Sequence, residues 1–150
     1  MMVSILVITH GEMAAGMIDS LKLIAGEPEN VEPIALVAGQ DFEDFKAEIK
    51  QRIKALDKGD GVLVLVDLFG ASPYNASMFL YNELQGEGNN IRIVTGVSLP
   101  MLLETNAMKE FMSLEELANH ALSSGKEGVQ EPISTLLNTP TDDADEGGDY

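Results

Sequence analysis

The chain has 150 residues, a formal net charge of −16 and no cysteine. This length suits one compact domain that buries a real core. The lack of cysteine excludes a disulfide framework and thiolate metal sites, and it favours a reducing, cytoplasmic location. The acidic balance argues against nucleic acid as a partner, because no basic cluster is present to replace phosphate counterions.

The predicted elements alternate between strands and helices along the chain. Residues 3–9 form a continuous apolar run, which is typical of a strand buried on both faces. The predicted strands are 3–9, 31–37, 62–69 and 91–96, and the predicted helices are 12–25, 42–56, 73–84, 99–108 and 114–123. Residues 125–138 fit either one more strand or an extended arm.

This alternation predicts an α/β fold, a doubly wound three-layer sandwich around a four-stranded parallel sheet. We expect the strand order 2-1-3-4, with Pro33 on an edge strand and a possible fifth strand near the C-terminus. The predicted domain covers residues 1–130. Residues 131–150 form a C-terminal arm and an acidic tail that we expect to be disordered.

In such a sheet the ligand site lies beyond the carboxyl ends of the strands, where the winding reverses. That point falls between the first and third strands, which end near His10 and Asp67. A neutral imidazole is a good nucleophile for a phosphoryl group when a carboxylate holds the proton on Nδ1. His10 is therefore the candidate catalytic nucleophile, and Asp67 is the candidate residue that orients it.

Phosphate oxygens also need hydrogen-bond donors at this crevice. Helices that begin after His10 and at Ser72 would direct free backbone amides toward it. The candidate phosphate-binding residues are Gly11, Gly70, Ala71 and Ser72, with Ser72 as a helix N-cap followed by Pro73 at the first helical position.

Other interpretations of these residues exist. A lone histidine at a strand end is often structural, and an aspartate after a strand is often a turn or N-cap residue. Residues 11–16 have glycines at P-loop spacing but lack the lysine that must follow. Asp67 also fits a response-regulator receiver, but the acid pair expected after the first strand is replaced by Thr9 and His10. His120 is expected to be a surface or packing residue.

Four separated stretches resemble one known family. They are VITHGEMA (7–14), VDLFGASPYNA (66–76), VTGVSLPMLLET (94–105) and SGKEGV (124–129). Over residues 2–130 the chain resembles the EIIA component of the mannose family of the bacterial phosphoenolpyruvate-dependent sugar phosphotransferase system (PTS). One departure is Ala71, where the family usually has glycine.

The resemblance implies a phosphocarrier. His10 would accept a phosphoryl group on Nε2 from the phosphocarrier protein HPr and pass it to a histidine of an EIIB domain, with a membrane EIIC/EIID complex further downstream. It also implies that Asp67 holds His10 Nδ1, that Ser72 receives the phosphate, and that Pro100 and Met101 form a docking rim. The resemblance also implies a homodimer in which a fifth, C-terminal strand within residues 125–138 can be exchanged between subunits. It implies neither a cofactor nor a metal.

Two alternatives remain open at this stage. A regulatory EIIA-like module, whose phosphorylation state controls a partner protein, would need the same His10. The phosphoryl-carrier subunit of dihydroxyacetone kinase has a similar fold, but its loop after the third strand lacks the pattern that Ser72, Pro73 and Asn75 supply here.

Overall fold

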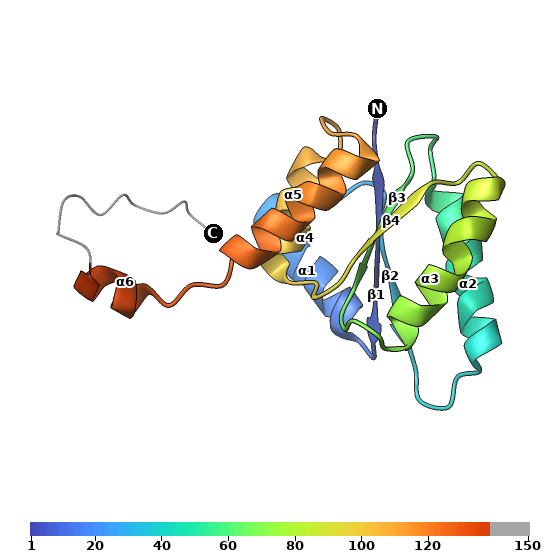
Figure 1. Cartoon of the computed structure of the whole chain (residues 1–150), viewed down its shortest axis with the longest axis horizontal. Coiled ribbons are helices and arrows are strands. Elements are labelled where there is room, and N and C mark those ends of the chain that lie inside the picture. The colour runs from blue at the N-terminus through green and yellow to red at the C-terminus, as the bar shows by residue number, and fades with distance from the viewer. Residues whose placement is uncertain (139–150) are drawn as a thin grey trace.

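The computed structural model describes residues 1–138, and its centre is a parallel four-stranded sheet (Figure 1). The strands are β1 Ser4–His10, β2 Val31–Leu36, β3 Val62–Val66 and β4 Ile91–Val94. They lie in the order β2-β1-β3-β4, and each neighbouring pair is parallel. The predicted fold class and strand order are confirmed.

The composition of the strands explains their places in the sheet. Every residue of β3 is buried, and so is every residue of β1 except His10, as expected for central strands covered on both faces. Pro33 lies in β2 opposite Val7 of β1. Proline has no N–H to donate to a second neighbour, so β2 is suited to the edge that it occupies.

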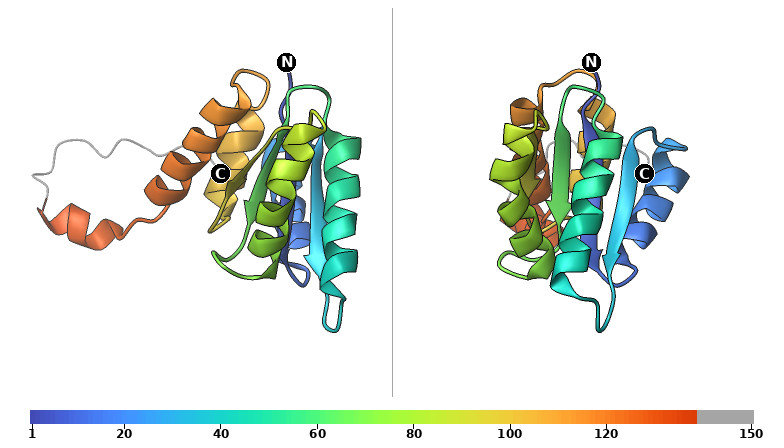
Figure 2. Two further views of the ribbon diagram at one scale, coloured as in Figure 1. Left: turned by 45° about the vertical axis from the view of Figure 1, so that its right-hand side comes forward. Right: turned by 90° about the vertical axis from the view of Figure 1, so that its right-hand side faces the viewer.

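Helices cover both faces of the sheet (Figures 1 and 2). The helices are α1 Met13–Ala25, α2 Phe42–Leu56, α3 Ser72–Gly86, α4 Leu99–Met108, α5 Leu114–Glu127 and α6 Pro132–Asn138. On one face α2 and α3 pack against the sheet around the buried Phe45 and Leu80. None of the helices within residues 1–138 has the length and hydropathy that a membrane span requires.

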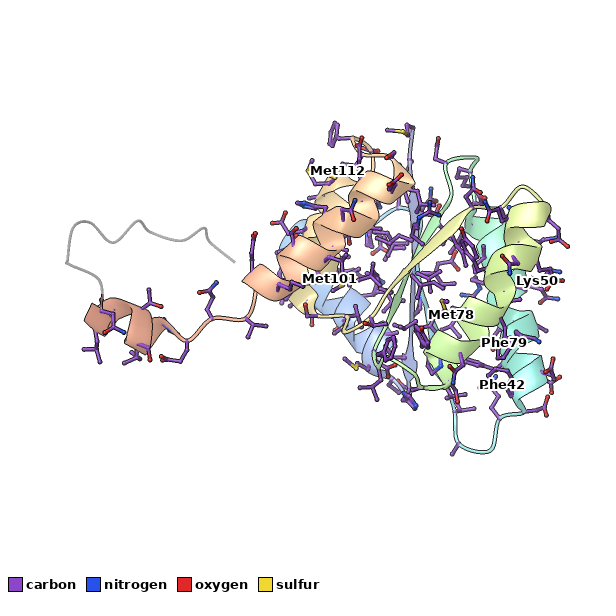
Figure 3. All side chains as sticks on the ribbon, in the orientation of Figure 1. Phe42, Lys50, Met78, Phe79, Met101 and Met112 are labelled. Carbon is purple, nitrogen blue, oxygen red and sulfur yellow. The ribbon has the colours of Figure 1, made fainter. Side chains whose placement is uncertain are left out.

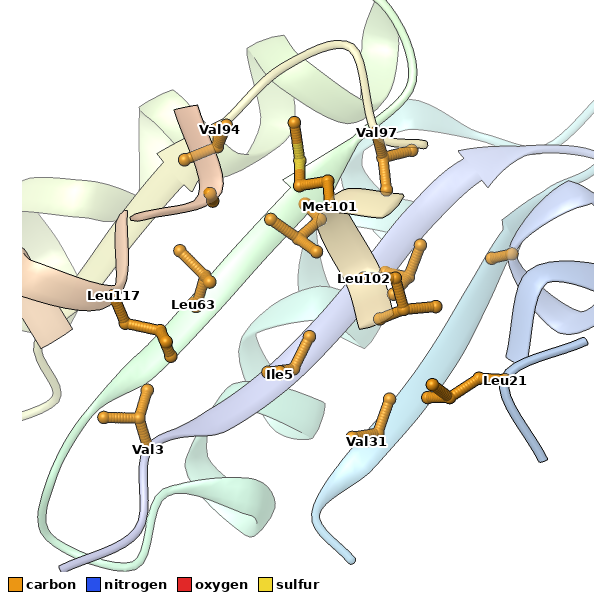
Figure 4. Packing of buried hydrophobic residues seen from close by; sticks show 14 of the residues in the cluster. Val3, Ile5, Leu21, Val31, Leu63, Val94, Val97, Met101, Leu102 and Leu117 are labelled. Atoms are coloured by element: carbon orange, nitrogen blue, oxygen red, sulfur yellow. The ribbon is translucent and has the colours of Figure 1, made fainter. Parts of the chain in front are cut away.

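The helices α1, α4 and α5 cover the other face of the sheet. Figure 4 shows their core, in which Leu21 of α1, Leu102 of α4 and Leu117 of α5 pack with Ile5 and Leu63 of the central strands. All five side chains are fully buried. Together the two cores fix the direction of β1 and β3, and with it the edge of the sheet where both strands end.

The C-terminal segment differs from the prediction. We expected the last helix to end at residue 123, but α5 continues to Glu127. For residues 125–138 we expected a strand or an arm. The part from Pro132 to Asn138 is the helix α6, so the prediction of a fifth strand is wrong for the chain as described, while the segment does project from the domain as an arm (Figure 1). The predicted tail, residues 139–150, lies outside the described residues.

Local chemistry explains why α6 is a helix. The Glu131 carboxylate accepts hydrogen bonds from the amides of Ile133 and Ser134, at 3.0 and 2.7 Å, so it caps the helix that Pro132 begins. Ile133, Leu136 and Leu137 then recur at the spacing of one helical face. All three side chains are exposed, because α6 packs against no other described element of the chain.

Two glycines allow α5 to lie close to α4. A Cβ atom on Gly125 would stand 2.6 Å from Met101 Cε, and one on Gly128 would stand 2.9 Å from Cβ and Cγ of Pro100. Both distances are shorter than carbon atoms can approach, so a side chain at either position would require its neighbour to move. The Pro100 ring is rigid and cannot move easily, whereas Met101 Cε is the end of a flexible side chain. This approach explains why α5 continues through Gly125 although glycine is a weak helix former.

Candidate functional site

The site is built where β1 and β3 end side by side. His10 is the last residue of β1, and Asp67 follows β3 directly. His10 Nδ1 lies 2.7 Å from Asp67 Oδ2, and the same oxygen accepts a hydrogen bond from the His10 amide at 2.8 Å. The other carboxylate oxygen, Oδ1, accepts from the Leu68 amide at 2.9 Å. The structure therefore brings together the two residues that the sequence predicted to meet.

These contacts set the charge of Asp67. Burial raises the pKa of its carboxyl, but the hydrogen bonds from the His10 amide and ring and from the Leu68 amide outweigh burial, and the pKa lies below its ordinary value. The ionised carboxylate can only accept hydrogen bonds, so in the neutral ring the proton is on Nδ1 of His10 and the lone pair is on Nε2. The His10 side chain is 49% exposed, against 9% for Asp67. The ring that carries the nucleophilic nitrogen, Nε2 of His10, is therefore accessible to solvent.

Thr9 has a role that the sequence analysis missed. Its side chain is fully buried, and its hydroxyl oxygen accepts a hydrogen bond from the Ala14 amide at 2.8 Å. Ala14 lies in the first turn of α1, so Thr9 caps the helix from the end of β1. The alternation of side chains along a strand could have indicated this role. It places Thr9 and His10 on opposite faces of the sheet, with Thr9 on the face that α1 covers. Gly11, with φ +57°, forms the turn between the two elements.

The turn after Asp67 shows one correction. The N-cap of α3 is Ala71, with φ −87° and ψ 176°, and no side chain caps this end. Ser72 is the first helical residue, so its prediction as the N-cap is wrong by one position. Proline is tolerated throughout the first helical turn, and Pro73 therefore does not fix the cap at Ser72. The negative φ of Ala71 shows that its methyl group is compatible with this backbone, and Gly70 supplies the positive φ of +81°.

A groove of about 640 Å³ lies beside His10. It is lined by residues of the β1–α1 turn, the end of β2, the loop that follows β2, and the start of α3: His10, Gly11, Glu12, Ala35, Leu36, Val37, Ala38, Gly39, Gln40, Phe42 and Ser72. We call it the His10 groove. Three predicted site residues, His10, Gly11 and Ser72, thus share one opening, whereas Gly70 and Ala71 lie in the adjoining turn and outside the lining.

The two residues predicted to form a docking rim differ in their exposure. Pro100 is exposed and lines a separate cavity of about 520 Å³ between α1, α4 and α5. Met101 is only 3% exposed, because it packs into the core beneath Gly125 (Figure 3). The structure therefore contradicts the expected partner contact at Met101, whose side chain no docked protein can reach.

Other apolar side chains do surround the site. Met13, Val37, Leu68 and Phe69 are exposed in the turns next to His10 and Asp67. Phe69 stacks on Tyr74 with ring centroids 4.8 Å apart. This surface extends to α2 and α3, where Phe42 and Phe79 make an edge-to-face contact at 6.2 Å (Figure 3). Exposed apolar groups around a polar centre are typical of a protein-binding surface.

His120 lies away from this site, as expected. Its Nε2 lies 3.2 Å from Glu104 Oε2, so the histidine is partnered by α4 and not by its own helix. Among residues 1–138 no cluster of histidine, aspartate and glutamate side chains is arranged to hold a metal ion. Within the described chain the oriented imidazole of His10 is thus the group with evident chemistry.

Fold and site together define a doubly wound α/β protein with an oriented imidazole at its topological switch point. Residues 4–122 match the family of PTS system fructose IIA components, and the chain belongs to this family.

Individual relatives agree with this assignment. The mannose-specific EIIAB component of Escherichia coli K12 is 34% identical over 131 residues, which are 87% of this chain but 39% of that protein. The chain thus spans about two fifths of that relative. The sorbose-specific EIIA component of Klebsiella pneumoniae is 31% identical, over 79% of this chain and 84% of the relative. The crystal structure of an EIIA component from Streptococcus agalactiae aligns with a TM-score of 0.81 and 28% identity, covering 89% of this chain and 99% of that one.

Proposed function

We propose that the chain is a phosphocarrier of a sugar phosphotransferase system, in which His10 accepts a phosphoryl group from phospho-HPr and passes it to a histidine of EIIB. The observation that carries this proposal is the 2.7 Å contact between His10 Nδ1 and Asp67 Oδ2. It directs the lone pair of the ring to Nε2 on an exposed side chain. Family membership favours this role over a regulatory module or a dihydroxyacetone kinase subunit.

The transfer itself requires little from the protein beyond position and charge. His10 Nε2 attacks phosphorus while the bond from phosphorus to the donor nitrogen breaks, and the donor imidazole keeps that electron pair. The proton on Nδ1 stays between the ring and Asp67, whose negative charge stabilises the imidazolium that forms. In the transfer to EIIB, a histidine of EIIB attacks phosphorus and His10 is the leaving group.

Backbone amides would bind the phosphoryl oxygens. We propose that these donors come from Gly70, Ala71 and Ser72 at the start of α3, with the Ser72 hydroxyl in addition. The Gly11 amide, which the sequence also suggested, already donates to the Leu36 carbonyl at 2.9 Å, so Gly11 contributes only an open turn without a side chain. The N-terminus of α3 has no capping side chain, which leaves its first amides available. Both helix N-termini also favour a negative charge at this edge of the sheet.

The proposal includes the surroundings of the carrier. Residues 1–130 would form the EIIA domain and residues 131–150 an arm with its tail, in the cytoplasm, with an EIIC/EIID membrane complex reached only through EIIB. We also propose a homodimer. The dimer is supported by the apolar face of α6, on which Ile133, Leu136 and Leu137 are exposed and could pack against a second subunit. Light scattering of the purified full chain tests the dimer directly.

The carrier proposal is tested by reconstitution. The full chain is incubated with phosphoenolpyruvate, enzyme I and HPr, and its intact mass is measured before and after acid treatment. We expect one acid-labile phosphoryl group on the wild type and on His120→Ala, and none on His10→Ala. Labelling of His10→Ala, or a wild-type chain that remains unlabelled, would contradict the proposal.

A further inference from the structure

Glu12 is the acidic residue in the lining of the His10 groove. The groove lining contains no lysine or arginine, and apart from His10 its remaining residues are uncharged. Asp67, beside the groove, is also negative but is held by hydrogen bonds from His10 and Leu68. The basic residue nearest to the groove lining along α2 is Lys46, which pairs with Glu43 at 3.0 Å. A phosphoryl group on His10 would therefore share its opening with an uncompensated carboxylate.

The Glu12 side chain does not stabilise the fold through a capping hydrogen bond. Glu12 occupies the N-cap position of α1, but its side chain accepts no capping hydrogen bond. The first-turn amide that an N-cap side chain usually takes, that of Ala14, is bonded to Thr9 at 2.8 Å instead. Within residues 1–138 the exposed Glu12 carboxylate makes no hydrogen bond or ion pair. Removing its charge should therefore leave the fold unchanged.

We infer that Glu12 raises the transfer potential of the phosphoryl group on His10 by electrostatic repulsion. This inference rests on the proposed phosphocarrier function and adds a residue that sets its energetics. In unphosphorylated His10 there is no phosphoryl charge for the carboxylate to repel. Once the Nε2–P bond has formed, the phosphoryl oxygens carry a charge near −2 beside the −1 of Glu12, and the phosphorylated state alone rises in free energy.

The size of the effect follows from Coulomb's law. The shared groove lining places the two groups near each other, and we take a separation of about 7 Å in water for charges of −2 and −1. Repulsion then lowers the equilibrium constant of phosphoryl uptake about fivefold at 0.01 M salt. Screening reduces this factor to about twofold at 0.15 M salt and to almost nothing at 1 M salt, because the Debye length falls to about 3 Å. A merely steric or structural role of Glu12 would not follow this salt dependence.

The experiment measures the equilibrium between phospho-HPr and this chain. Purified phospho-HPr is mixed with the full chain without enzyme I, and intact mass gives both phosphorylated fractions at equilibrium. For Glu12→Gln we expect an uptake constant about fivefold above wild type at 0.01 M salt, with the difference lost at 1 M salt. Asp19→Asn is the matched control, since it removes the same charge from an exposed site on α1, two turns away from the groove.

The outcomes separate the two proposals. Equal uptake constants for wild type and Glu12→Gln at 0.01 M salt overturn the role of Glu12, as does an increase that Asp19→Asn reproduces or that persists at 1 M salt. A wild-type chain that takes no phosphoryl group from phospho-HPr contradicts the phosphocarrier function itself. Because the readout is an equilibrium constant, a change in docking rate alone does not alter it.

Discussion

Replacing Asp67 by asparagine tests the central contact of the site. Asp67 Oδ2 accepts hydrogen bonds from both the amide and the ring of His10, at 2.8 and 2.7 Å. Asparagine keeps one acceptor oxygen but loses the negative charge that stabilises the imidazolium in the transition state. A hydrogen bond to a charged group contributes about 1.5–3 kcal/mol, so phosphoryl uptake should slow by about 10- to 150-fold.

The assay is single-turnover phosphorylation by phospho-HPr, followed by rapid quenching and mass measurement. Saturating phospho-HPr separates the chemical step from binding, and we expect the loss in the rate at saturation. Asp57→Asn serves as the control. Asp57 also accepts backbone amides, those of Gly59 and Gly61, but it lies in the turn before β3, at the opposite end of that strand. A rate for Asp67→Asn within about twofold of wild type would refute the orienting role of the carboxylate.

The pH dependence of stability provides a second readout of the same residue. The pKa of the Asp67 carboxyl is lowered in the folded chain, so its ionised form is stabilised by folding. This stabilisation is fully present above the unfolded pKa of about 3.9 and is lost as the pH falls through the lower, folded value. In urea titrations Asp67→Asn should therefore be less stable than wild type near neutral pH, and the difference should shrink as the solution becomes acidic.

Two further predictions concern the stability of the fold, one at the helix cap beside His10 and one at the contact between α4 and α5. Thr9→Val leaves the Ala14 amide buried without an acceptor and should lower the free energy of unfolding by about 1–3 kcal/mol in urea titrations, whereas Thr9→Ser should restore most of it. Gly128→Ala should destabilise by about 1–3 kcal/mol, because its Cβ would meet the rigid Pro100 ring at 2.9 Å. The control Gly125→Ala should cost less, since the atom it meets is the flexible end of Met101 and alanine favours the helix.

Most of the fold was predictable because strand burial and helix periodicity are strong local signals. The apolar runs at β1 and β3 identify them as central strands, Pro33 identifies an edge, and these facts nearly fix the order of the sheet. The order then makes His10 and Asp67 neighbours although 57 positions separate them. The candidate site thus followed from topology, before any side-chain geometry was known.

The parts that were not predictable depend on contacts between elements. The continuation of α5 through Gly125 depends on how closely Met101 approaches, which no local pattern records. The burial of Met101 likewise follows from the way α4 packs under α5. The helix α6 is a different case. Glu131 followed by Pro132 is a helix-start signal in the sequence, but a strand or an arm was predicted there instead.

A phosphocarrier must release its phosphoryl group as readily as it accepts it, and the charges around His10 are arranged for such a balance. The N-termini of α1 and α3 favour the phosphorylated state, and so does Asp67 once the ring becomes an imidazolium. Glu12 opposes it from within the same groove, and no basic side chain of the groove lining offsets that opposition. Without the Glu12 charge, the equilibrium would shift toward phosphorylated His10 by about twofold at 0.15 M salt. The Glu12 carboxylate, which caps no helix amide, would thus adjust the balance between the two states without setting it alone.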